Sequence, residues 1–136
     1  MKKILTLITS LAVTAASLSA KVVKDYGSTS DNVLTFVVDS IDYRQDLTRV
    51  YGRVQGRPHT SNRIDEVQYI STGTALKSND IDGVDFRRYF QWEDEGEIPI
   101  EIDFPATKPE TGVQFIFTTP RGKSTTTAKK IFTKHK

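Results

Sequence analysis

The segment 58–62 places an imidazole beside hydroxyl groups, a combination that could support covalent catalysis. His59 precedes Thr60 and Ser61, so a base stands next to two potential nucleophiles. Sequence neighbours rarely have the geometry of a catalytic triad, however, and the chain has no glycine-flanked nucleophile elbow. A zinc enzyme of the usual kind would need His135 to reach in from the tail. We therefore expect a polar loop here, no catalytic residue, and a protein that is not an enzyme.

Alternating acids around a glycine at positions 80–85 have the character of a calcium-binding loop. Asp80, Asp82 and Asp85 surround Gly83. The EF-hand register fails, because with Gly83 at loop position six the first and last positions of the loop would both lack a carboxylate. These acids are weak calcium candidates, and a turn whose carboxylates accept local N–H groups is the simpler expectation. No cofactor is expected.

The segment 86–92 is the densest aromatic stretch of the chain, and it contains the only tryptophan and two arginines. Interleaved basic and aromatic residues can stack on sugars or bases. Large aromatic residues also dominate small cores, so we expect Phe86, Phe90 and Trp92 to form the main core cluster. Arg88 would then pack its aliphatic stem among them. Tyr89 would point outward and be free to bind.

Arg49, Tyr51 and Arg53 alternate along one predicted strand and should share one of its faces. Because Arg and Tyr are enriched at interface hot spots, this stripe could bind an acidic partner or a sugar. The simpler alternative is a cross-strand ladder with the acids of 97–103. The three residues are the first candidates for partner contacts, with Tyr89 as an additional one.

The first twenty residues have the order of a secretory signal peptide. Two lysines precede an apolar run at 4–16, and small residues then lead to Ala20. The run is thirteen residues long and contains four hydroxyl residues, so it is too short and too polar to remain in a bilayer. We expect residues 1–20 to be cleaved and the protein to be exported to the periplasm or the extracellular space of a bacterium.

The chain contains no cysteine. Disulfides, thiolate zinc sites and thiol catalysis are therefore excluded, and so is the residue to which bacterial lipoproteins attach their anchor. Residues 21–136 are numerous enough to bury a core without crosslinks. We expect one soluble domain over 21–136 with no stable membrane anchor.

The charge of the expected mature chain is balanced but uneven. Without Lys2 and Lys3, 17 basic residues face 17 acidic residues. The segment 121–136 carries six basic residues and no acidic one. A neutral total without a broad basic field argues against nucleic acid as a partner.

Period-two alternation dominates the chain and predicts β-strands. The clearest case is 98–104, where apolar and polar residues alternate strictly. Pro99 lacks a backbone donor, which predicts a sheet edge or a bulge at this position. We expect further strands at 33–44, 47–55, 64–71, 85–92 and 113–119.

Turn signals recur every eight to twelve residues, which is typical of a sandwich or a small barrel. Pro120-Arg121-Gly122 forms one such turn, after which we expect a basic C-terminal strand or tail at about 122–136. The predicted fold is an all-β antiparallel sandwich of about seven or eight strands with immunoglobulin-like architecture.

The function expected from these features is binding without catalysis. The preferred partner is an envelope or extracellular protein, and the alternative is a carbohydrate- or calcium-binding module. An uncovered edge strand could also pair two copies, so a homodimer is compatible with the sequence.

Overall fold

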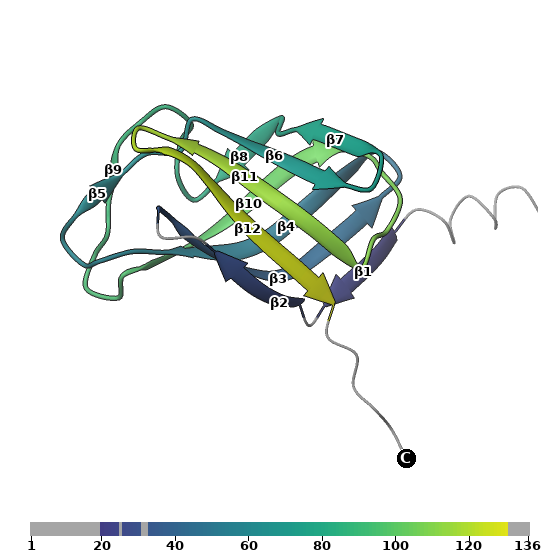
Figure 1. Ribbon diagram of the computed structural model, residues 1–136, viewed down its shortest axis with the longest axis horizontal. Coiled ribbons are helices and arrows are strands. Elements are labelled where there is room, and N and C mark those ends of the chain that lie inside the picture. Colours follow the sequence, from purple (N-terminus) through teal and green to yellow (C-terminus); the bar gives the residue numbers. More distant parts are fainter. Residues whose placement is uncertain (1–19, 25, 31–32, 131–136) are drawn as a thin grey trace, which may run out of the picture.

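The computed structural model describes residues 20–24, 26–30 and 33–130, and these build two antiparallel sheets packed face to face (Figure 1). Sheet A contains, in spatial order, β1 (Ala20–Lys24), β3 (Thr35–Arg44), β4 (Leu47–Gln55), β10 (Glu97–Pro105) and β8 (Asp80–Asp82). Sheet B contains β2 (Tyr26–Ser30), β12 (Gly122–Lys130), β11 (Gly112–Thr119), β6 (Glu66–Ser71) and β7 (Thr74–Lys77). A small third sheet pairs β5 (Ser61–Asn62) with β9 (Phe90–Gln91).

The all-β antiparallel sandwich is confirmed, whereas the expected number of strands is wrong. The two large sheets contain ten strands, because the short strands β1, β2, β7 and β8 form their edges. Such strands carry too few alternating residues to stand out in the sequence. Residues 1–19 of the predicted signal peptide and residues 131–136 of the basic tail lie outside the described residues, whereas Ala20, the last residue of that predicted segment, begins β1. Within the described part of the chain, no helix is long and apolar enough to cross a membrane.

The strict alternation of β10 places its two faces as expected. Ile100, Ile102 and Phe104 are buried between the sheets, whereas the acidic positions between them face outward. Pro99 lies where β10 pairs with β4 alone, because β8 reaches only as far as residues 101–103. The missing N–H of Pro99 therefore interrupts no ladder on that side.

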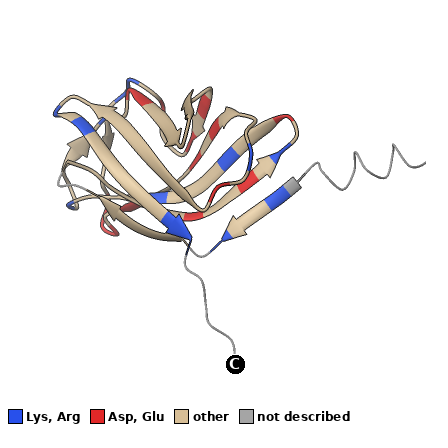
Figure 2. Cartoon of the chain, turned by 45° about the vertical axis from the view of Figure 1, so that its right-hand side comes forward, with Lys and Arg blue, Asp and Glu red and all other residues tan. Residues whose placement is uncertain are grey.

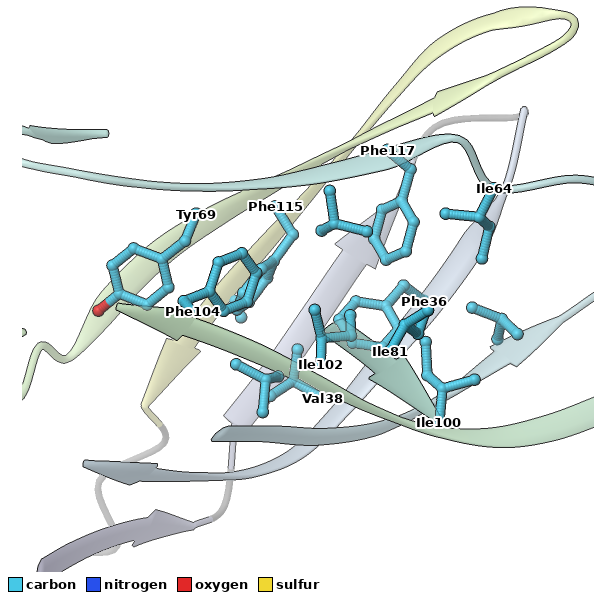
Figure 3. Close-up of a cluster of buried hydrophobic side chains, with 14 of the residues drawn as sticks. Phe36, Val38, Ile64, Tyr69, Ile81, Ile100, Ile102, Phe104, Phe115 and Phe117 are labelled. Carbon is cyan, nitrogen blue, oxygen red and sulfur yellow. The ribbon is translucent and has the colours of Figure 1, made fainter. Parts of the chain in front are cut away.

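Aromatic rings from both sheets interlock in the core (Figure 3). Phe36 of sheet A makes edge-to-face contacts with Phe115 and Phe117 of sheet B, with ring centroids 5.5 and 4.9 Å apart. Tyr69 and Phe104 extend the cluster, at a centroid distance of 5.6 Å from each other. All five side chains are fully buried.

The prediction that Phe86, Phe90 and Trp92 form the main core cluster is wrong. Trp92 is buried, but Phe86 and Phe90 are only partly buried and pack against the core from outside. Arg88 is exposed rather than packed among them. The segment also fails as a strand, because a turn occupies 86–87 and only Phe90–Gln91 pairs with β5. Arg87 adopts a positive φ of 62°, which an extended strand cannot accommodate.

Thr48 places a polar hydroxyl group inside the sandwich, and its effect on stability can be measured. Its side chain is fully buried, and Oγ1 has no hydrogen-bond partner among the residues that the structure describes. A buried hydroxyl without a partner costs about 1–3 kcal/mol. We expect Thr48→Val to raise the free energy of unfolding by about 1 kcal/mol, measured by urea denaturation.

Thr126 provides the matched control for this experiment. It is equally buried, but its hydroxyl shares a hydrogen bond of 2.8 Å with that of Ser30. The same change, Thr126→Val, should therefore lower the stability. Equal losses from both variants would show that the Thr48 hydroxyl is satisfied in solution.

Candidate functional site

The predicted arginine stripe lies on the outer face of sheet A, where basic and acidic positions adjoin (Figure 2). Arg49 donates from Nε and Nη2 to the two carboxylate oxygens of Asp103, at 2.7 and 2.9 Å. This bidentate hydrogen bond raises the pKa of Arg49 above its ordinary value. The guanidinium is therefore already paired within the sheet.

Arg53 links the two strands that flank β4. It donates to both Asp39 oxygens at 2.9 and 3.2 Å and to Glu97 Oε2 at 3.2 Å. Hydrogen bonding to Asp39 raises the pKa of Arg53. Asp39 is the extra residue of a β-bulge in β3, so no residue of β4 lies directly opposite it. The stripe is thus the cross-strand ladder considered as its alternative, with Asp39 as an additional member.

Tyr51, the remaining member of the stripe, is half-buried and lines a hollow of about 360 Å³ on the same face. Asp82 and Glu101, which also line it, lie directly opposite each other in the register of β8 and β10. The hollow is open to solvent and mostly bounded by the sheet itself. Tyr51 therefore lies between the acids of this hollow and Arg49, with which it also interacts.

The calcium candidates do not converge. Asp80 and Asp82 lie on the edge strand β8, whereas Asp85 lies in the following turn, 3.6 Å from Arg88. Among the described residues there is no group of three or more His, Cys, Asp or Glu side chains that could hold a metal ion.

His59 faces a carboxylate rather than the neighbouring hydroxyls. Its Nε2 lies 3.0 Å from Asp94 Oδ1, and both side chains are exposed. The hydroxyl of Thr60 donates to the Arg57 carbonyl at 2.7 Å. This geometry engages the imidazole and the Thr60 hydroxyl with different partners.

Residues 56–63 and 85–96 form a lobe, here called the end lobe, at one end of the sandwich around β5 and β9 (Figure 1). Backbone hydrogen bonds join its two segments, from Trp92 N to Thr60 O at 2.8 Å and from His59 N to Trp92 O at 2.7 Å. His59 and Arg87, both with positive φ, are the only such non-glycine residues in the described part of the chain. Backbone strain of this kind clusters at functional sites.

Tyr89 is the most exposed large aromatic side chain of the end lobe, with 61% of its surface accessible. The guanidinium carbon of Arg63 lies 5.1 Å from the centre of its ring. Arg63 is itself held by two hydrogen bonds to Asp65, at 2.7 and 3.0 Å. These bonds lower the pKa of Asp65 and raise the pKa of Arg63. The outward orientation expected for Tyr89 is confirmed.

A pocket of about 290 Å³ lies between the end lobe and the adjacent strand ends of the sandwich. Five separate segments line it, namely 33–35, 55–57, 60–62, Trp92 and Arg121. A Cβ atom added to Gly56 would lie 2.1 Å from the Trp92 indole, so the wall of the pocket is closely packed there.

Sequence reasoning missed this pocket. Arg57 follows the predicted strand at 47–55, and Arg121 lies in a predicted turn, but nothing in the sequence indicates that the two converge. No family model, curated protein or solved structure shows significant similarity to this chain.

Arg53 provides a test of the ladder. Its side chain is 37% exposed, and ion pairs this exposed are screened by water and salt. We expect Arg53→Ala to lower the free energy of unfolding by no more than about 1 kcal/mol. The measurement is urea denaturation at low and at high salt.

Reversing the charge of the arginines should lower the free energy of unfolding more than removing one of them. In the variant Arg49→Glu/Arg53→Glu, new carboxylates would face the existing acids of the ladder and repel them. This double variant should lose more stability than Arg53→Ala, and added salt should recover part of the loss. A loss above about 2 kcal/mol for Arg53→Ala alone would contradict the weak-pair interpretation.

Proposed function

We propose that this chain is a non-catalytic binding module of the bacterial envelope or extracellular space. Residues 1–20 would act as a cleaved signal peptide, and the sandwich, immunoglobulin-like in architecture, would serve as the scaffold. Its partner is another envelope or extracellular protein. The contact surface is the end lobe, with Tyr89 at its centre.

The observation that carries this proposal is the exposed Tyr89 ring stacked on Arg63. Tyr and Arg are the residue types that dominate interface hot spots. Asp65 fixes Arg63 in place, so the pair is ordered before any partner arrives. Pre-ordered side chains lose less conformational entropy when they bind.

The arginine stripe is less suited to an acidic partner than the sequence indicates. The guanidinium groups of Arg49 and Arg53 already donate to carboxylates of the same sheet. An incoming acid would have to displace these intramolecular partners. Loops at the end of a sandwich, by contrast, are the usual place for binding residues.

The proposal predicts that Tyr89→Ala weakens partner binding by at least about tenfold, because truncating a hot-spot tyrosine removes its whole contact. The experiment is a crosslinking pull-down of residues 21–136 from a cell-envelope fraction, followed by titration of the recovered partner by calorimetry. Tyr51→Ala serves as the comparison variant, since it removes the same side-chain type from the outer face of sheet A.

A partner that is lost with Tyr89→Ala and kept with Tyr51→Ala supports the end lobe. The reverse result would move the contact to the arginine stripe. Recovery of no specific partner would contradict the protein-binding function. Circular dichroism of both variants excludes unfolding as the cause.

A further inference from the structure

We propose that the pocket beside the end lobe binds a carboxylate-bearing sugar residue, of the uronic acid type. This inference goes beyond the proposed function, because protein contact through Tyr89 and sugar binding in the pocket can succeed or fail independently. It rests on the charges, the polar groups and the size of the pocket.

Two arginines of the pocket differ from most others of this chain. Five arginines of the chain lie within ion-pair distance of an acid, namely Arg44, Arg49, Arg53, Arg63 and Arg88. Neither Arg57 nor Arg121 has such an acidic partner within the part of the chain that the structure describes. The fold nevertheless brings both to one pocket from distant positions in the sequence. Two guanidinium groups in one pocket suit a carboxylate ligand, which they can hold by bidentate hydrogen bonds.

The other polar groups of the pocket match the hydroxyls of a sugar. Asn62 is only 6% exposed, and its Oδ1 accepts the Arg63 N–H at 2.8 Å. Its amide N–H groups have no hydrogen-bond partner in the described ranges, so a ligand hydroxyl could accept from them. The hydroxyl residues Thr35 and Ser61 line the same pocket. Sugar hydroxyls both donate and accept, and can therefore satisfy all of these groups together.

The size of the pocket fits one sugar ring rather than a long ligand. Its volume of about 290 Å³ lies at the lower end of the range for small-molecule sites. Trp92 forms part of its wall and is the only tryptophan of the chain. Its fluorescence therefore reports on occupancy of this pocket without any label.

The experiment titrates residues 21–136 with galacturonic acid, a single sugar ring, and, in parallel, with its methyl ester, which keeps the ring hydroxyls and removes the charge. Trp92 fluorescence and calorimetry follow binding. We expect the acid to bind and the ester to bind at least about tenfold more weakly. Sodium chloride should weaken binding of the acid, because these guanidinium groups are accessible to solvent.

Arg57→Gln and Arg121→Gln should each weaken binding of the acid by about tenfold or more. Lys129→Gln is the matched control, because Lys129 is an exposed cation at the far end of β12 from the turn that holds Arg121. It should leave the affinity unchanged. Neither Arg57 nor Arg121 takes part in an ion pair of the described structure, so unchanged melting curves are expected for both variants.

Three results would overturn the inference. Equal binding of the acid and the ester would show that no carboxylate is recognised. Equal or tighter binding of a peptide with a free C-terminal carboxylate, or of inorganic phosphate, would show that the pocket does not select a sugar. No change in Trp92 fluorescence or heat with any of these probes would exclude the site.

Discussion

The structure depends on the interlocking of aromatic rings between two sheets that no disulfide bond links. The chain has no cysteine, so burial of apolar surface must hold the sheets together. Phe36 of sheet A contacts both Phe115 and Phe117 of sheet B edge to face. This packing fixes how the ends of the strands meet, and the end lobe and its pocket are built on those ends.

The arginines on the outer face of sheet A differ in their surroundings from the arginines beside the end lobe. On the outer face, the ladder of arginines and acids pairs internally across three strands. Such pairs add little stability when they are exposed, but each of these arginines already has an acidic partner on the same face. At the lobe end, Arg57 and Arg121 line a pocket to which the described residues contribute no acid. The contrast separates a structural use of arginine from one that is open to a ligand.

The sequence predicted strands correctly where the local alternation of residues matched their burial in the fold. The alternation in 98–104 and the strand at 47–55 both appear in the fold, because period-two alternation acts over a few residues. The strand prediction failed for 85–92, whose aromatic residues resemble a core strand. There the turn at Arg87 sends Phe86 and Phe90 to the periphery, and rings from four other strands fill the centre.

The amino-acid sequence by itself determined the all-β class, the faces of the long strands and the absence of disulfides, since each follows from residue type and spacing. Only the tertiary structure decided which charges meet. The bulge at Asp39 supplies a second acid to Arg53, and strand order sets Arg49 against Asp103. The convergence of Arg57, Asn62 and Arg121 likewise depends on how separate loops pack. Such contacts join residues far apart in the chain, and no local periodicity encodes them.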